Sequence, residues 1–141
     1  MDLETIQEMW EKDSKIDDIL LDKASLKIPQ LHQKYLTLIN EFRLLRKKKS
    51  NELRKMTHRK WLYYSGKASP EEYEKEPFNY KVMKSDVNNW VAVDDAILRI
   101  ETQIEYYDTL LDTLSEIMKQ INQMSYNIKK AITWRTFTGG V

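Results

Sequence analysis

An apolar repeat in the C-terminal half of the chain most constrains how it can fold. Positions 90 to 132 alternate in steps of three and four residues, and no glycine or proline occurs from 78 to 138. The repeat consists of Trp90, Val93, Ile97, Ile100, Ile104, Tyr107, Leu111, Leu114, Met118, Ile121, Ser125, Ile128 and Ile132. A sustained 3.5-residue period is typical of left-handed supercoiled helices. A helix of about 70 Å exceeds a small domain's diameter, so we expect one long heptad helix over 86–134, packed as a long hairpin, a coiled coil or both.

The rest of the chain also reads as helical, so we predict a single all-α domain over residues 1–141. Residues 1–23 carry eight acids, including Asp18, at roughly helical apolar spacing, which indicates an acidic N-terminal helix. Pro29 predicts a break or kink near 24–29 and a basic helix over 29–64. Residues 65–84 form a linker in which Ser69-Pro70-Glu71-Glu72 resembles a capping box, predicting a short helix from 70 to about 76. Residues 135–141 are the tail.

Composition and motifs narrow the function by exclusion. The 141 residues include no cysteine, which rules out disulfides and cysteine-based zinc sites. The start of the chain has no signal-peptide pattern, and no apolar run approaches the roughly 18 residues of a membrane-spanning helix. We therefore expect a soluble cytoplasmic protein. His32 and His58 are isolated, and no phosphate-cradling or Ser/His/Asp motif occurs. We expect no enzyme activity, no metal and no cofactor.

Positive charge is concentrated in one segment. Residues 43–60 contain nine Lys/Arg and one acid, Glu52, in a chain whose net charge is only +1. The spacing of these cations distributes them around a helix. Lys47 and Arg54 lie on one side, and Lys48 and Lys55 lie on another. Lys49 and Lys60 fall within the apolar face and interrupt it. Cations that nearly encircle a helix suit a membrane surface poorly. The pattern favours binding to a polyanion, with nucleic acid ahead of lipid.

Single-stranded nucleic acid fits this segment better than duplex DNA. A major-groove reader presents Arg, Asn or Gln to base edges, and here Asn51 is almost alone. The aromatic residues that follow the cations, Trp61, Tyr63 and Tyr64, suit stacking on unpaired bases. Core packing is the competing explanation for these rings, because Tyr63 continues the apolar face.

The same stretch carries a family resemblance. The run Lys60-Trp61-Leu62-Tyr63-Tyr64-Ser65-Gly66, followed by Tyr73-Glu74-Lys75, resembles the recombination mediator proteins of T-even-type bacteriophages, the UvsY family. The likeness continues at Ser85-Asp86, Leu110-Leu111-Asp112 and Trp134-Arg135, and covers essentially the whole chain. No single motif is specific, but their order, their spacing and the total length together are.

The resemblance implies a protein that binds single-stranded DNA and forms a homo-oligomeric ring, a heptamer in the family. It further implies help in loading a RecA-like recombinase onto strands coated by single-strand-binding protein, in the cytoplasm of a phage-infected host. The family's DNA-contacting basic pair falls at His58 and Lys60; His58 departs from it because histidine is mostly neutral at pH 7. Its C-terminal self-association region falls on the heptad helix and tail.

Two sets of site residues follow. The candidate DNA-binding residues are Lys47, Lys48, Arg54, Lys55, His58, Arg59, Lys60, Trp61 and Tyr64. The candidate oligomerisation residues are Ile97, Ile100, Ile104, Tyr107, Leu111, Leu114, Met118, Ile121, Ile128 and Ile132. Two alternatives stay open: a non-enzymatic coiled-coil scaffold whose basic helix docks an acidic protein partner, and an RNA chaperone.

Overall fold

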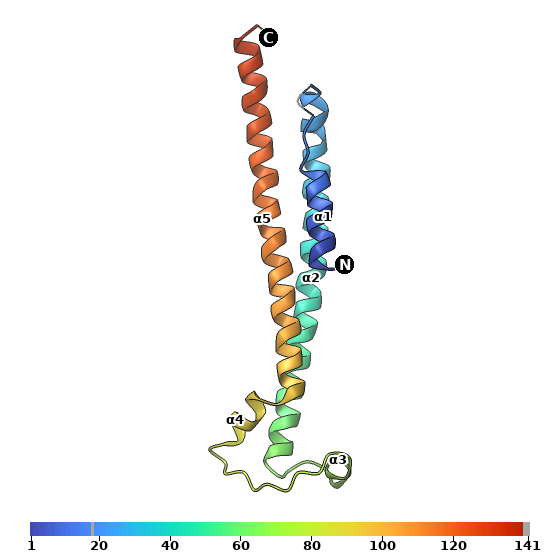
Figure 1. Cartoon of the computed structure of the whole chain (residues 1–141), viewed down its shortest axis with the longest axis vertical. Helices are drawn as coiled ribbons and strands as arrows, with labels where there is room; N and C mark the ends of the chain where they lie inside the picture. The colour runs from blue at the N-terminus through green and yellow to red at the C-terminus, as the bar shows by residue number, and fades with distance from the viewer. Residues whose placement is uncertain (18, 140–141) are drawn as a thin grey trace. The chain divides into compact units, whose positions relative to one another are not determined.

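The computed structural model describes residues 1–17 and 19–139, and these contain five helices and no strand (Figure 1). In chain order the helices are α1 (Leu3–Asp13), α2 (Leu21–Tyr64), α3 (Pro70–Lys75), α4 (Val87–Ala92) and α5 (Asp95–Phe137). The all-α prediction is confirmed. The chain divides into two compact units, one made of 1–43 with 109–141 and the other of 44–108. Residues 18, 140 and 141, which include part of the predicted acidic helix and tail, lie outside the described residues.

In the first unit, α1 runs antiparallel beside the first part of α2 (Figure 1). Ile6, Tyr35 and Leu114 are completely buried in its core. The ring of Trp10 packs edge-on against Tyr35 with centroids 5.6 Å apart, and its Nε1 donates to the Gln120 side chain at 2.7 Å. The Tyr35 hydroxyl donates to Asp13 Oδ2 at 2.9 Å. One aromatic pair therefore ties α1 to both long helices.

The N-terminal helix is shorter than predicted. It ends at Asp13 instead of continuing to 23, and the Ser14 backbone N–H closes it by bonding to Trp10 and Lys12 carbonyls. Just beyond, the Asp17 side chain accepts from the Ile19 N–H at 2.9 Å. Short polar side chains that bond to nearby backbone favour turns over helix, which explains why the apolar spacing did not prevail here.

The break predicted near 24–29 is absent, because α2 begins at Leu21, before the predicted start at 29, and continues through Pro29. The alternative, a kink, stays a prediction. A proline in a helix interior removes one backbone hydrogen bond, the one to the carbonyl four residues earlier. Both Pro29 and Ser25, which loses that bond, are exposed. The unpaired carbonyl is therefore on the solvent side, where water can satisfy it, while the apolar face of α2 stays packed.

The predicted short helix is confirmed as α3. Ser69 is its N-cap and accepts from the Glu72 N–H at 3.3 Å, Pro70 is its first residue, and it ends at Lys75, two residues before Pro77. The second half of a capping box is missing, since the Glu72 carboxylate pairs with Arg59 at 2.7 Å and does not return to Ser69. Glu72 therefore contacts α2 instead of capping its own helix.

The single helix predicted over 86–134 is wrong at its start. α4 ends at Ala92, and α5 begins at Asp95 after Val93 and Asp94. Asp94 Oδ1 accepts from the Ala96 and Ile97 N–H groups at 2.9 and 3.4 Å. This is an N-cap, for which aspartate is among the best residues. Trp90 and Val93, the first two positions of the repeat, therefore lie outside the long helix.

From Ile97 onward the apolar repeat coincides with a buried face of α5. Ile97, Ile100, Leu114, Ile121 and Ile128 are buried. Ile104, Tyr107, Leu111 and Met118 are half-buried, and Ile132 is 43% exposed. Leu110 and Ile117, which the repeat omitted, are buried as well. The buried face is thus wider than a strict heptad seam, as expected for a helix that packs within its own chain.

The completely buried Leu114 allows a test of the first unit's core. We expect Leu114→Ala to lower the free energy of unfolding by about 2–5 kcal/mol, because it removes buried methyl groups and leaves a cavity. Leu26→Ala, at a side chain that is 74% exposed in the same unit, is the control and should change stability by about 0.5 kcal/mol or less. Urea unfolding followed by circular dichroism measures both; equal effects would contradict the assignment of this core.

Candidate nucleic-acid interface

The cationic segment lies on α2, and most of its residue types favour a helix. Leu, Arg, Lys and Met are all strong helix formers. Four of the predicted DNA-binding cations, Lys47, Lys48, Arg54 and Lys55, are exposed. None of them forms an ion pair within residues 1–17 and 19–139. His58 is exposed as well. This stretch of α2 therefore presents uncompensated positive charge to solvent.

Two other cations of this stretch are partly neutralised. Arg46 forms a bidentate pair with Asp108, with Nη2 3.3 Å from Oδ2. The pair raises the pKa of Arg46, through the hydrogen bond and then the carboxylate charge. Lys49 lies 3.1 Å from Glu52, and both side chains are partly exposed. Exposed pairs of this kind contribute little to stability, so Lys49 can exchange its partner readily.

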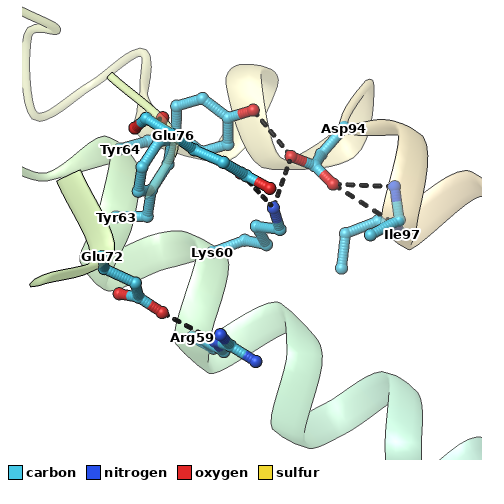
Figure 2. Close-up of polar contacts among 9 residues, drawn as sticks. Arg59, Lys60, Tyr63, Tyr64, Glu72, Glu76, Asp94 and Ile97 are labelled. Carbon is cyan, nitrogen blue, oxygen red and sulfur yellow. Dashed lines mark hydrogen bonds and ion pairs between the residues drawn. The ribbon is translucent and has the colours of Figure 1, made fainter. Parts of the chain in front are cut away.

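Arg59 and Lys60, two of the predicted DNA-binding cations beside the aromatic run, both contact acids (Figure 2). Arg59 Nε lies 2.7 Å from Glu72 Oε1, with 63% of the arginine side chain exposed. Lys60 Nζ lies 3.3 Å from Asp94 Oδ2 and 3.9 Å from Glu76 Oε2, with only 17% of its side chain exposed. Two cations thus meet three carboxylates, and the local charge is not positive.

Asp94 contacts groups from both α2 and α5 in the second unit (Figure 2). One carboxylate oxygen caps α5, and the other accepts from the Tyr64 hydroxyl at 2.7 Å and faces Lys60. Burial alone would raise the pKa of Asp94, but the hydrogen bonds from Tyr64 and Ala96, together with the Lys60 charge, lower it below its usual value. The pKa of Tyr64 is raised, by burial first and then by its bond to Asp94. Lys60 is consequently part of the packing of the unit as well as a surface cation.

The predicted stacking residues pack against the protein itself. Trp61 and Tyr64 contact the core formed by Val87, Val91 and Ile97. The Tyr64 ring also meets Phe78 edge-on, with centroids 5.2 Å apart. Lys67 Nζ lies 5.0 Å from the centroid of the Trp61 ring. The packing explanation therefore accounts for both rings, and their contact with DNA stays a prediction.

The structure thus separates the predicted DNA-binding residues into two groups. Lys47, Lys48, Arg54 and Lys55 stay free of acids among the described residues, whereas Arg59 is paired with Glu72, and Lys60 and Tyr64 contact Asp94. Sequence reasoning missed the acids that hold this second group. The signal that could have found Asp94 is its fit to an N-cap before an apolar helix; Glu72 and Glu76 carry no comparable signal, because their approach to α2 depends on the path of the linker.

The predicted oligomerisation residues all lie on α5. Ile97, Ile100, Ile104 and Tyr107 belong to the second unit, and the others to the first. Near the end of α5 several large apolar side chains are exposed, including Trp134 at 65% and Phe137 at 83%. Within the described residues there is no helix long and apolar enough to cross a membrane, and no group of three residues that could hold a metal ion.

The described residues are helical, and one long helix carries a cluster of unpaired cations. These two features are typical of helical proteins that bind a polyanion through charge. The profile of the family described as "Recombination, repair and ssDNA binding protein UvsY" matches residues 9–141. The chain therefore belongs to the UvsY family, a family of DNA-binding recombination proteins and not of enzymes. The resemblance noted from the sequence is confirmed.

Individual relatives agree with this membership. The recombination protein uvsY of Enterobacteria phage T4 is 24% identical over 140 residues, which is 99% of each chain. A crystal structure of the bacteriophage T4 recombination mediator protein UvsY (lattice type II) superposes with a TM-score of 0.87 at 24% identity, covering 99% of both chains. A second crystal form (lattice type IV) gives 0.84 at 22% identity, covering 98% of this chain and 99% of that one. The fold is shared along the whole chain.

The lowered pKa of Asp94 predicts how stability changes with pH. A carboxyl whose pKa is depressed on folding stabilises the folded state above its unfolded pKa and loses that contribution as pH falls through the folded pKa. We expect Asp94→Asn to cost about 1.5–3 kcal/mol at neutral pH. The difference from the unchanged protein should shrink below the ordinary Asp value of 3.8. Urea unfolding at neutral and acidic pH measures it.

The control for this experiment is Asp86→Asn. Asp86 is exposed in the same unit and makes no side-chain capping bond to α4. We expect it to have little effect at any pH. If the two variants lose the same stability at neutral pH, the arrangement around Asp94 does not hold the second unit together.

Proposed function

We propose that this protein is a recombination mediator that binds single-stranded DNA and helps a RecA-like recombinase load onto strands coated by single-strand-binding protein. It acts in the cytoplasm of the infected host cell during phage recombination and repair. The observation that carries the proposal is the group of four exposed cations on α2 that no acid in the described residues neutralises, in a chain of the UvsY family.

The chemistry of these cations suits a mediator. Lysine and arginine side chains on an exposed helix bind phosphates through charge, with no reading of base sequence. A mediator must hold any strand and then release it to the recombinase, which this kind of binding permits. We propose that DNA contacts the cations from Lys47 to Lys55 first. Arg59 and Lys60 contribute where phosphate replaces their acidic partners, together with His58 and the rims of Trp61 and Tyr64.

We also propose that the protein acts as a homo-oligomeric ring, of seven copies as the family resemblance implies. The exposed Ile132, Trp134 and Phe137 near the end of α5 support self-association, because such side chains avoid water by meeting another copy. Among the heptad residues, those still partly exposed in the single chain would form the coiled-coil contacts: Ile104, Tyr107, Leu111, Met118 and Ile132. The others, Ile97, Ile100, Leu114, Ile121 and Ile128, are buried within the chain itself. A ring places several copies of the cationic helix on one strand, and this multiplies a modest affinity.

DNA binding should depend on salt and favour single strands. We expect tight binding to an oligo(dT) of about 40 nucleotides, with the logarithm of affinity falling by about 0.7 per phosphate contact for each tenfold increase in salt. A duplex of equal length, measured in parallel by fluorescence anisotropy, should bind more weakly. Recombinase filament formation on strands coated by single-strand-binding protein then tests the mediator step. Absence of oligo(dT) binding at about 100 mM salt would favour a scaffold for an acidic protein.

Assembly can be tested at the end of α5 without disturbing the buried core. Ile132→Glu places a charge on a side chain that is 43% exposed in the single chain. We expect it to shift the protein toward smaller species in sedimentation velocity while helicity is kept. Asn122→Glu, at an exposed polar position of the same helix, is the matched control and should leave assembly unchanged. If neither variant loses assembly, the interface between copies lies elsewhere.

A further inference from the structure

A groove of about 610 Å³ lies in the second unit, next to the unpaired cations. Lys48, Lys49, Asn51 and Lys55 of α2 line it on one side, and Tyr107 of α5 lines it on the other, with Glu52 as its acid. Its volume is within the range of about 300–1,000 Å³ that is usual for small-ligand sites. The groove thus combines cations, one amide and an aromatic ring within a space that can hold part of a nucleotide chain.

The charge of the groove favours an anion. Lys48 and Lys55 are exposed and form no ion pair with any described residue. They are seven residues apart, so they lie on the same side of α2 and about 10 Å apart along its axis. That distance exceeds the roughly 3.4 Å rise per nucleotide of a stacked strand, so the two lysines can contact different phosphates of one strand.

The remaining polar side chains add to this preference. Lys49 is paired with Glu52 at 3.1 Å, but with 29% and 49% of the two side chains exposed the pair is a weak one. A phosphate in the groove can therefore take the place of Glu52. The Asn51 amide supplies a neutral donor of the kind that binds phosphate oxygens. Only Glu52 opposes an anion, against three lysines.

Tyr107 supplies the element that separates a strand-binding groove from a simple phosphate site. Its side chain is half-buried and forms the α5 side of the groove. Unpaired bases stack on aromatic rings in proteins that bind single strands without sequence preference. The neighbouring pocket at Arg59, Lys60 and Lys75 is smaller, about 220 Å³, and sets two carboxylates, Glu72 and Glu76, against its three cations. That pocket is therefore the poorer place for a phosphate.

We propose that this groove between Lys48, Lys55 and Tyr107 is where single-stranded DNA binds, its phosphates on the lysines and one base against the tyrosine ring. The inference rests on the proposed DNA-binding function and places its main contact one to three turns before the Arg59–Lys60 pair. In this arrangement Lys60 serves mainly to hold Asp94, and Tyr107 contacts DNA in addition to any part in assembly.

The first test compares two charge-matched double variants. Lys48→Gln with Lys55→Gln should weaken oligo(dT) binding on the order of tenfold or more, and should lower the salt slope by about 1.4, because two phosphates are no longer neutralised. Lys81→Gln with Lys84→Gln removes the same charge from exposed positions of the same unit outside the groove. We expect it to change affinity much less. Equal effects of the two double variants would overturn the proposal.

The second test measures separately what the Tyr107 ring and the Glu52 carboxylate contribute to DNA binding. Tyr107→Leu should weaken binding on the order of tenfold and by more than Tyr107→Phe does, since only leucine removes the stacking surface. Sedimentation velocity accompanies both, and a loss of affinity that appears only with loss of assembly would overturn the role of Tyr107. Glu52→Gln should tighten binding, because it removes the groove's competing carboxylate; unchanged or weaker binding speaks against the groove.

The proposed function and the groove fail in different ways. If the unchanged protein does not bind oligo(dT), the proposed function and the groove fall together. If it binds with the expected salt dependence while the groove variants behave like the Lys81 and Lys84 control, the function stands and the groove is wrong.

Discussion

The second unit depends on how one buried carboxylate is satisfied. Asp94 is 8% exposed, and removing it from water is costly unless hydrogen bonds and an opposite charge compensate. The start of α5, the hydroxyl of Tyr64 and the ammonium of Lys60 supply that compensation together. Because these groups come from α2 and α5, the carboxylate holds the two long helices together at this end. The aromatic run that follows Lys60 is packed as a consequence, so rings that suit base stacking by type are used for the core.

This arrangement divides the cations of α2 by task. Near the linker, acids from α3 and its surroundings meet Arg59 and Lys60, and the positive charge there is cancelled. Further back, from Lys47 to Lys55, Glu52 is the only acid in the helix itself, and most of the charge remains available to phosphate. The cost of breaking the existing ion pairs decides which of these two groups of cations binds DNA more easily. An exposed pair such as Arg59–Glu72 is exchanged at little cost, whereas withdrawing Lys60 leaves a buried carboxylate without its counter-charge. A strand therefore meets the free lysines at lower cost.

Much of the fold could be predicted from the sequence, and the predictions that were wrong have specific physical causes. The short helix at Pro70 was predicted from its serine cap, its proline and the proline that follows, which are local signals. The long helices were predicted from apolar spacing, but their ends were not. The interruption at Asp94 depends on a side chain that outcompetes helix continuation, and the continuity of α2 through Pro29 depends on the missing bond facing solvent. The candidate site was found as a segment, since a run of cations is visible in the sequence, yet its free and neutralised parts could not be told apart.

The sequence by itself determined that the chain is helical, that its charge is concentrated on one helix and that it belongs with the UvsY proteins, because spacing, composition and residue order are properties of neighbours along the chain. Only the tertiary structure decided which cations stay free. Along the chain, the acids Glu72, Glu76 and Asp94 lie 13 to 34 residues from the basic side chains that they contact. Tyr107 is more than 50 residues from Lys55. Contacts over such separations follow from how the linker and the two long helices pack, and Coulombic pairing acts over a few ångströms in space whatever the distance along the chain.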